Sequence, residues 1–283
     1  MRMLRQACKE DGLLGKSILK STDIRGMNNQ SFDSKRIAEG YKERPFLHKQ
    51  VIEQFLKDSS EQQYQNGLDV GCGAGLSAKA LKMICRNVTG TDISPEMIAV
   101  AQEICGEEGY TFFPCKAEEV PHPAVPYDIV TAAGVVQWVE RDTFLRNLHR
   151  IMCPGGEVLI YDFCISDRMA GCEAYTAWWH EQYLKEFPKP YRNEEVWTQE
   201  DVGPVGFRMV KQIPLELSYE FDLDAFVKFM MIQSNVNVKI ESNERSADQV
   251  RQWFCETLAD IFASGKQTAI FTGYSWYLQN CQI

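Results

Sequence analysis

The chain of 283 residues is long enough for one large α/β domain with an elaboration, or for a main domain and a small second one. Hydrophobic residues make up 45% and charged residues 24%, which are ordinary values for a folded protein with a sizeable core. The formal net charge of -9 argues against a general nucleic-acid binder, because neutralising phosphates requires a basic face.

Membrane insertion and metal binding are also disfavoured. No apolar run reaches the roughly 18 residues of a membrane span, and charges and glycines interrupt residues 1–20 where a signal peptide needs an apolar core. We therefore expect a cytoplasmic protein. The ten cysteines contain no C-x-x-C pair, and the four histidines show no metal-ligand spacing, so no metal site is expected.

The order of patterns along the chain predicts an α/β fold. Residues 1 to about 30 are weakly patterned, and residues 46–56 predict an amphipathic helix. Short apolar runs then alternate with helical patterns over residues 67–163, which is typical of a parallel sheet with helices on both faces. Strands are expected at residues 67–70, 87–93, 110–115, 127–133 and 157–163, and helices between them at 76–85, 95–105 and 144–152.

The pattern changes after the fifth expected strand. Residues 174–197 hold three tryptophans, three tyrosines and two prolines, and they do not fit another βα unit.

Earlier in the chain, Ser94 and Pro95 predict a helix N-cap with proline in the first helical position, so the strand before them should end near Asp92. The last part of the chain predicts a strand within residues 208–221, helices over 222–234 and 246–264, and a strand over 268–278.

Three glycines, Gly71, Gly73 and Gly75, follow the first expected strand directly. In a doubly wound sheet, ligands bind beyond the carboxyl ends of the strands, where the first strand-to-helix turn approaches them with bare backbone. A dinucleotide fingerprint would read G-x-G-x-x-G, whereas the sequence here reads D-x-G-x-G-x-G. Asp69 places a negative charge where a pyrophosphate would be repelled and an ammonium group attracted.

Two later elements describe the rest of the ligand. Asp92 lies at the end of the second expected strand, where such folds place a carboxylate that accepts hydrogen bonds from both ribose hydroxyls. After the third strand, Ala117 and Glu118 offer a backbone NH and a carboxylate to an adenine edge. A ribose, an adenine and a cationic amino-acid tail together describe S-adenosylmethionine.

These motifs, in this order, resemble the class I S-adenosylmethionine-dependent methyltransferases over residues 67–163. YDIVTAAGVVQWV resembles the fourth strand of that family and the loop that faces the transferable methyl, and IMCPGGEVLIYDF resembles its P-G-G turn into the fifth strand. The resemblance implies a Rossmann-like doubly wound seven-stranded sheet, S-adenosylmethionine as cofactor and S-adenosylhomocysteine as product. The expected cofactor-binding residues are Asp69, Gly71, Cys72, Gly73, Gly75, Asp92, Ile93, Met97, Ala117, Glu118, Ala133 and Gly134.

Two of these positions need comment. Many relatives carry an acid before the alanine of the adenine motif, whereas this chain has Lys116. Adenine recognition is therefore expected to rest on the Ala117 backbone and on Glu118. Cys72 is interpreted as a small packing residue of the turn rather than as a nucleophile.

The acceptor is suggested by further resemblances. The Gln137-Trp138 pair resembles that of trans-aconitate methyltransferases and malonyl-carrier-protein O-methyltransferases, which are carboxyl methyltransferases. FDLDAFVKFMMIQSNV, with Ser234, and IAEGYKERPFLHKQVI, with Tyr41, resemble helices of the same group. We therefore expect an enzyme that methylates a small molecule, with a carboxylate oxygen as the leading acceptor. Methylation of a ring at nitrogen or carbon, and a cofactor-binding sensor without turnover, stay open as alternatives.

The aromatic segment lies where this family inserts a cap after the fifth strand. A carboxylate acceptor calls for an arginine, either Arg192 or Arg44, whereas a hydroxyl or amine acceptor calls for a base, for which His180 is the histidine of the cap. The packing alternative is that Trp178, Trp179 and Tyr183 form the cap's own small core. The expected substrate-binding residues are Tyr41, Gln137, Trp138, Trp178, Trp179, Tyr183, Tyr191 and Ser234.

The expected organisation has four parts. Residues 1–44 form an N-terminal arm and the start of a lid helix, and residues 45–165 form the cofactor-binding core. Residues 166–206 form the cap, and residues 207–283 complete the sheet and the pocket. The expected partner is a small-molecule substrate, with neither nucleic acid nor membrane, and the protein is expected to be a monomer or a homodimer.

Overall fold

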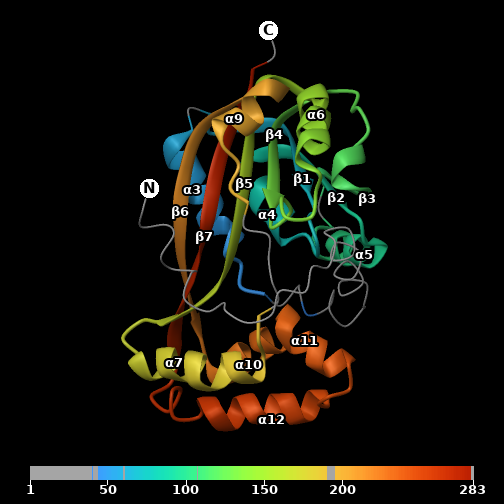
Figure 1. The fold of residues 1–283 in the computed structure, drawn as a ribbon. Helices are drawn as coiled ribbons and strands as arrows, with labels where there is room; N and C mark the ends of the chain where they lie inside the picture. Colours follow the sequence, from blue (N-terminus) through green and yellow to red (C-terminus); the bar gives the residue numbers. More distant parts are fainter. Residues whose placement is uncertain (1–39, 41–43, 60, 107, 190–194, 282–283) are drawn as a thin grey trace, which may run out of the picture.

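The centre of the protein is a seven-stranded sheet with strand order β3-β2-β1-β4-β5-β7-β6 (Figure 1). The structure is a computed structural model that describes residues 40, 44–59, 61–106, 108–189 and 195–281. The strands are β1 (Tyr64–Val70), β2 (Cys85–Asp92), β3 (Tyr110–Pro114), β4 (Tyr127–Ala133), β5 (Met152–Met169), β6 (Phe207–Phe221) and β7 (Gln267–Asn280). Strands β1 to β5 are mutually parallel, and β7 runs antiparallel to β5 and β6. The predicted Rossmann-like doubly wound sheet is confirmed.

Two apolar cores cover the two faces of the sheet. Successive residues of a strand point to opposite faces, so Ile129 of β4 belongs to one core and Val130 to the other. Helices α3, α4 and α5 pack on the Ile129 side, and α6 packs on the Val130 side. The described helices are α3 (His48–Asp58), α4 (Leu76–Lys82), α5 (Pro95–Ile104), α6 (Arg141–Ile151), α7 (Glu173–Trp178), α8 (Leu184–Glu186), α9 (Gln199–Val202), α10 (Leu223–Met231), α11 (Ser234–Glu241) and α12 (Ala247–Leu258).

Local signals in the sequence explain where several elements begin and end. The Ser94 side chain accepts a hydrogen bond from the Met97 NH at 3.3 Å, and Pro95 is the first residue of α5, as predicted. Before α6, the Glu140 carboxylate accepts hydrogen bonds from the NH groups of Asp142 and Thr143. These caps satisfy NH groups that a helix leaves without an internal partner, so the chain leaves β2 and β4 along defined paths.

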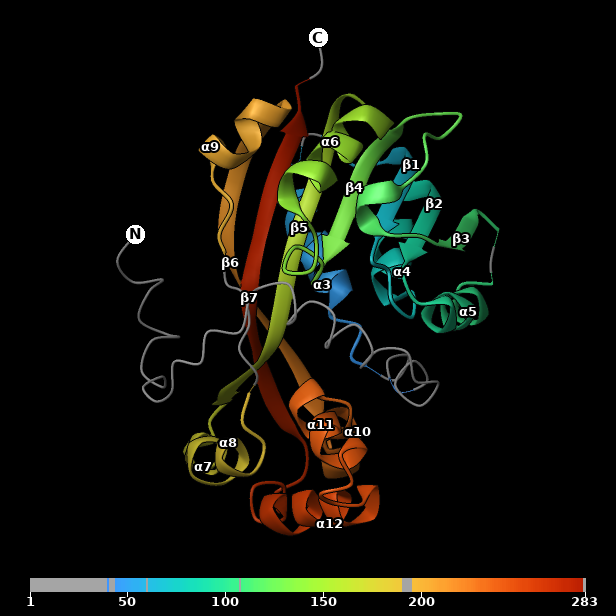
Figure 2. The same cartoon turned by 45° about the vertical axis from the view of Figure 1, so that its right-hand side comes forward.

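The strands β5, β6 and β7 extend past the carboxyl edge of the other strands, and helices gather at their far ends (Figures 1 and 2). We call this group, made of α7, a π-helical turn over Trp179–Tyr183, α8, α10, α11 and α12, the helical layer. β5 is therefore longer than the predicted 157–163. The helical layer combines the aromatic segment after β5 with the helices after β6, and α11 was not predicted.

The aromatic side chains that follow β5 form the interior of the helical layer. Trp178, Trp179 and Tyr183 are all buried, with ring centroids 5.4 Å apart for Trp178–Tyr183 and 4.6 Å apart for Trp179–Tyr183. The Tyr183 hydroxyl lies 3.2 Å from Asn235 Oδ1, and Asn235 Nδ2 donates to the Phe187 carbonyl at 2.7 Å. These contacts support the packing interpretation of the three aromatic residues.

Trp197, the last aromatic of the predicted cap segment, lies elsewhere. It belongs to the core on the α6 side, with ring centroids 6.2 Å from Phe144 and 5.9 Å from Trp276. α9 follows it at the end of the sheet opposite the helical layer (Figure 1). Residues 195–206 are therefore not part of the helical layer, although their composition grouped Trp197 with it.

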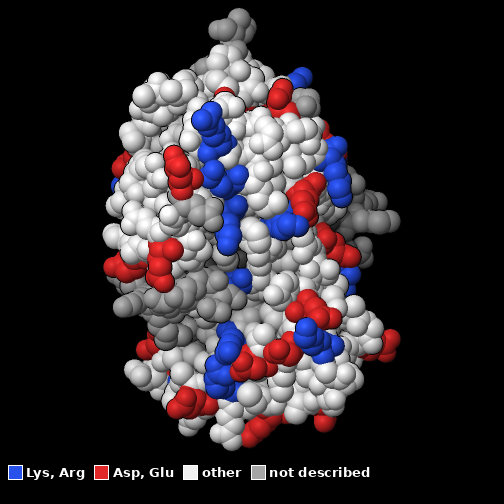
Figure 3. Space-filling view, turned by 180° about the vertical axis from the view of Figure 1, so that it is seen from behind, with Lys and Arg blue, Asp and Glu red and all other residues white. Residues whose placement is uncertain are grey.

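The surface charge, the helices and the arrangement of possible metal ligands add three observations. On the face turned away from Figure 1, Lys and Arg side chains form a column down the middle, with Asp and Glu side chains on both sides (Figure 3). Among the described residues, no helix combines the length and the apolar character that a membrane span requires. Within the same residues, no group of three or more His, Cys, Asp or Glu side chains is placed to hold a metal ion.

The aromatic interior should dominate the stability of the helical layer. Trp178→Ala should lower the free energy of unfolding by about 3–5 kcal/mol, because it removes a large buried side chain and leaves a cavity. Val196→Ala is the control: this side chain is 59% exposed, so the change should stay within about 0.5 kcal/mol. Urea unfolding measures both values. A loss below about 1 kcal/mol for Trp178→Ala would contradict the packing role.

Candidate functional site

The turn between β1 and α4 contains the three glycines of the predicted motif. Gly71, Gly73 and Gly75 all have positive φ angles, of 64°, 50° and 92°. At Gly75, an added Cβ would lie 3.2 Å from the Ala101 Cα, so this glycine permits close packing on α5. Among the described residues, no atom would lie within 4 Å of a Cβ added at Gly73. Gly73 therefore borders space, at the carboxyl edge of the sheet, that no described residue fills.

Asp92, at the end of β2, is joined directly to this turn. Its Oδ2 accepts a hydrogen bond from the Gly73 NH at 2.9 Å, and its Oδ1 accepts one from the Ser94 NH at 2.9 Å. The Cys72 NH also donates to the Thr91 carbonyl at 2.9 Å. The carboxylate is partly exposed and oriented by backbone groups, so the predicted glycine turn and acid form one local unit.

Asp69 lies beneath the turn and is fully buried. Ser77 Oγ, on α4, donates to its Oδ2 at 2.5 Å, and Thr131 Oγ1, on β4, donates to its Oδ1 at 2.6 Å. Burial raises the pKa of Asp69 to about 7, although the two hydroxyl groups act in the opposite direction. The sequence interpretation placed a negative charge next to the ligand, whereas the structure encloses this carboxyl group between two hydroxyls.

Cys72 is also buried, with 3% of its surface exposed. Burial raises the pKa of its thiol well above the ordinary value, and the nearby Asp69 and Asp92 carboxylates raise it further. The thiol therefore stays protonated and is a poor nucleophile. These properties support its interpretation as a packing residue.

The predicted adenine segment forms a short 3-10 turn over Ala117–Glu119. The Glu118 carboxylate accepts a hydrogen bond from the Glu140 NH at 2.9 Å, and the Glu118 carbonyl accepts one from Asn147 Nδ2 at 2.6 Å. Glu118 thus connects this turn to the beginning of α6. Its carboxylate contact with an adenine edge stays a prediction.

Two further expected cofactor contacts differ in exposure. Ile93 follows Asp92 and is 53% exposed, which places an apolar side chain on the surface beside the carboxylate. Met97 is buried and packs with Ala74 and Val100. Ile93 is therefore accessible to a ligand, whereas Met97 supports the turn from below.

The loop after β4 folds back on itself. The Gly134 NH donates to the Tyr161 carbonyl at 2.8 Å, and Gln137 Nε2 donates to the Gly134 carbonyl at 3.3 Å. Gly134 has a φ angle of 67°, and a Cβ there would lie 3.4 Å from Asp162 Oδ1. Ala133, Gln137 and Trp138 are partly exposed, so the loop presents several expected contact residues at the carboxyl edge.

The expected catalytic and remaining substrate residues are scattered. His180 is exposed, and its Nε2 lies 2.9 Å from Asp167 Oδ2. Ser234 is the first residue of α11 and is partly exposed. Arg44 lies close enough to His48 for its positive charge to lower the pKa of that imidazole. Tyr41, Tyr191 and Arg192 lie outside the described residues.

A pair that was not predicted, a buried tyrosine and a partly exposed histidine, lies at the same edge. The Tyr161 hydroxyl of β5 is 2.8 Å from His48 Nδ1 on α3, and the His48 ring also packs against Phe163 with centroids 5.2 Å apart. Both residues fall in predicted elements. Nothing in the sequence pairs them, because 113 positions separate them.

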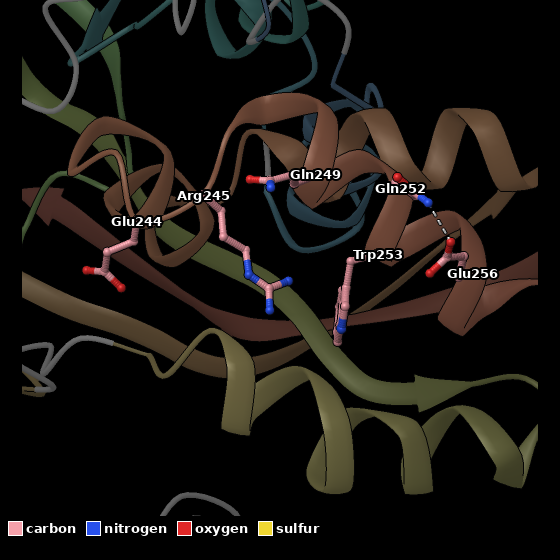
Figure 4. A pocket seen from close by; sticks show the side chains of 6 residues that line it. All are labelled: Glu244, Arg245, Gln249, Gln252, Trp253 and Glu256. Atoms are coloured by element: carbon pink, nitrogen blue, oxygen red, sulfur yellow. Dashed lines mark hydrogen bonds between the residues drawn. The ribbon is translucent and has the colours of Figure 1, made fainter.

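A surface hollow of about 370 Å³ lies in the helical layer (Figure 4). Gln252 Nε2 donates to Glu256 Oε1 at 2.7 Å, and Arg245 contacts Glu186 Oε1 at 3.3 Å. The hollow shares no residue with the glycine turn, with Asp92 or with the loop after β4. Its lining residues are Glu244, Arg245, Gln249, Gln252, Trp253 and Glu256.

Comparison with known families identifies the part of the chain that holds the glycine turn. Residues 68–160 match the model of the family described as "Methyltransferase domain". This part of the chain, about a third of its length, is similar to a methyltransferase domain. The match includes the glycine turn, Asp92, the 3-10 turn and the loop after β4, and it ends one residue before Tyr161.

Similar proteins extend this comparison. The malonyl-[acyl-carrier protein] O-methyltransferase of Erwinia billingiae is 30% identical over 125 residues, which are 44% of this chain and 49% of the relative. The ubiquinone biosynthesis O-methyltransferase of a Caulobacter species is 30% identical over 122 residues, 41% of this chain and 48% of the relative. The chain thus spans about half the length of these curated relatives.

A solved structure supports the fold outside the methyltransferase domain as well. A putative type II methyltransferase from Anaeromyxobacter dehalogenans superposes with a TM-score of 0.64 at 18% identity. The superposition covers 84% of this chain and 98% of that one. At this identity the likeness concerns the fold alone.

The buried Asp69 predicts a specific pH dependence of stability. Its pKa is about 7 in the folded protein, above the ordinary 3.8, so the folded state binds more protons between about pH 4 and pH 7. Asp69 therefore makes stability fall as the pH rises through this window. Asp69→Asn should remove that fall, so urea unfolding should show the variant gaining on the wild type from pH 4.5 to pH 7.5.

The exposed Asp260 provides the control for this measurement. Asp260→Asn leaves Asp69 in place, so it should keep the fall of stability with rising pH. A stability difference between Asp69→Asn and the wild type that did not change with pH would contradict the raised pKa.

Proposed function

We propose that the protein binds S-adenosylmethionine at the glycine turn and transfers its methyl group to a small-molecule acceptor. The observation that carries this proposal is the hydrogen bond from the Gly73 NH to Asp92, which orients a partly exposed carboxylate beside open space. The family match over residues 68–160 supports it. The core of residues 45–165 would hold the cofactor, in line with the expected organisation.

The described residues offer a separate role for each part of the cofactor. Asp92 is the candidate for the ribose hydroxyls, because its carboxylate is partly exposed and the NH groups of Gly73 and Ser94 fix its orientation. Ile93 offers an exposed apolar surface to an adenine ring, and Gly73 lets the ligand approach the backbone. When bound, S-adenosylmethionine supplies an electrophilic methyl group on a sulfonium.

The leading acceptor in this proposal is a carboxylate oxygen. A relative is named malonyl-[acyl-carrier protein] O-methyltransferase, and the Gln137-Trp138 pair belongs to the loop at the carboxyl edge. Another relative is named ubiquinone biosynthesis O-methyltransferase, so ring methylation is the competing assignment.

We further propose that the protein acts in the cytoplasm, as a monomer or homodimer, on a small molecule rather than on nucleic acid. The net charge of -9 supports the last point.

Cofactor binding can be tested at Asp92. Asp92→Ala should weaken S-adenosylmethionine binding at least tenfold in calorimetry, because charge-assisted hydrogen bonds contribute roughly 1.5–3 kcal/mol each. The fold should persist, since the side chain is partly exposed. Unchanged affinity would remove Asp92 from the cofactor site.

The glycine turn permits a test with a matched control. Gly73→Val should abolish cofactor binding by filling the space that the ligand needs. Gly155 has a comparable positive φ angle and the same open surroundings, but it lies near the start of β5, at the opposite edge of the sheet. Gly155→Val should bind normally, which separates occupied space from backbone strain. Normal binding by Gly73→Val would contradict the site itself.

The carboxylate assignment can be tested at the arginines. Arg44→Ala or Arg192→Ala should reduce kcat/KM for a carboxylic-acid acceptor by about 2–4 kcal/mol, because an anionic substrate loses its charge partner. Cofactor affinity should barely change. Arg146→Ala, at an exposed arginine of α6, is the control and should keep full activity. Near-normal turnover in both variants, or a neutral acceptor, would favour ring methylation.

A further inference from the structure

Tyr161 and His48 lie next to the proposed methyl-transfer site. The Tyr161 carbonyl accepts a hydrogen bond from Gly134 in the loop after β4. The strand registers Asp69↔Thr131 and Ala133↔Tyr161 put the Tyr161 side chain on the same face of the sheet as Asp69. Burial and then the nearby Asp69 charge raise the pKa of Tyr161, so its hydroxyl stays protonated.

The Tyr161–His48 hydrogen bond determines which ring nitrogen of His48 carries the proton. The Tyr161 hydroxyl is fully buried, and His48 is the one hydrogen-bond partner found for it among the described residues. Because the buried hydroxyl has no other acceptor among the described residues, we assign Tyr161 as the donor to Nδ1, which places the proton of the imidazole on Nε2. Within the described ranges, Nε2 has no acceptor, and the His48 side chain is partly exposed.

The imidazole is neutral at ordinary pH. Burial, followed by the positive charge of Arg44, lowers the pKa of His48 to about 3. Such a ring is too weak a base to collect a proton from a hydroxyl or amine acceptor, but its Nε2–H remains a hydrogen-bond donor. A neutral donor beside an arginine matches an anionic oxygen and disfavours a protonated amine.

We propose that His48 binds the carboxylate of the methyl acceptor through its Nε2–H, with Tyr161 as the positioning residue that fixes the ring and Arg44 as the charge partner. This assignment rests on the proposed methyl transfer and specifies its substrate class. A carboxylate oxygen attacks the methyl carbon as the carbon–sulfur bond breaks, and the bonding electron pair remains on sulfur. No proton leaves the acceptor, so the chemistry needs no base at His48.

The experiment uses the full chain and a defined set of acceptors. Succinate, glutarate, trans-aconitate and malonyl-coenzyme A, with the amides of the first three, are incubated with S-adenosylmethionine, and methyl-ester formation is measured. Calorimetry with S-adenosylhomocysteine is run in parallel. Absence of S-adenosylhomocysteine binding would overturn the proposed function. Binding accompanied by turnover of the amides, or of no carboxylate, would overturn the His48 assignment alone.

Four variants then separate a binding role from a structural one. His48→Leu should lower kcat/KM for the best carboxylate at least tenfold, mainly through KM, with S-adenosylhomocysteine affinity within twofold of the wild type. Tyr161→Phe should lower kcat/KM at least threefold. His48→Gln keeps a neutral NH donor, so it should recover most of the kcat/KM that His48→Leu loses. Lys49→Ala, at the next and exposed residue of α3, should match the wild type.

The conservative variants keep the proposal decidable if His48→Leu does not fold. A value of kcat/KM within twofold of the wild type for Tyr161→Phe would overturn it, whether or not His48→Leu folds. The pH profile is the second readout, because a neutral donor adds no ionisation between about pH 5.5 and pH 8. An inflection near pH 6.5 that disappears in His48→Gln would show that the ring titrates as a base, and it would overturn the donor assignment.

Discussion

The buried carboxyl group of Asp69 is the contact on which the geometry of the candidate site depends. It accepts hydrogen bonds from Ser77 on α4 and Thr131 on β4, so a single side chain of β1 joins three elements beneath the glycine turn. A buried polar group without partners is costly, so these elements are held in one arrangement. The turn above them then presents the Gly73 NH to Asp92, and this NH and that of Ser94 orient the partly exposed Asp92 carboxylate.

The helical layer depends on a different constraint, the length of β5, β6 and β7. β5 leaves the candidate site at Tyr161 and continues to Met169, so the same strand that holds the unpredicted Tyr161 also carries the helices that follow it. Gly40 lies against Ile232 at the end of α10, which brings the chain before α3 into contact with the helical layer. His48 thus lies on a segment that contacts both the sheet and the helices beyond it.

Features governed by neighbours in the sequence were predictable, and features that depend on distant pairing were not. The bounds of β4 and the Ser94 cap follow from local alternation and local hydrogen bonding, and both are confirmed. The Tyr161–His48 pair joins residues 113 positions apart, so no local pattern encodes it. Composition gave a wrong grouping for Trp197, which shares its segment with Trp178 but packs on the other side of the sheet. The number of aromatic residues in a segment does not show on which face of the sheet each one packs.

Burial shifts the pKa values of two titratable groups near the proposed methyl-transfer site in opposite directions, and both shifts favour the neutral form. The pKa of Asp69 rises to about 7 and that of His48 falls to about 3, because a low-dielectric environment disfavours either charge. His48 is too weak a base to remove a proton from an acceptor at neutral pH, and Asp69 is enclosed between the Ser77 and Thr131 hydroxyls, away from an acceptor. The positive charge that acts on His48 comes from Arg44, so this edge of the sheet favours an acceptor that arrives already deprotonated. A carboxylate meets that condition, and the displacement then depends on alignment and on the exclusion of water rather than on acid–base chemistry.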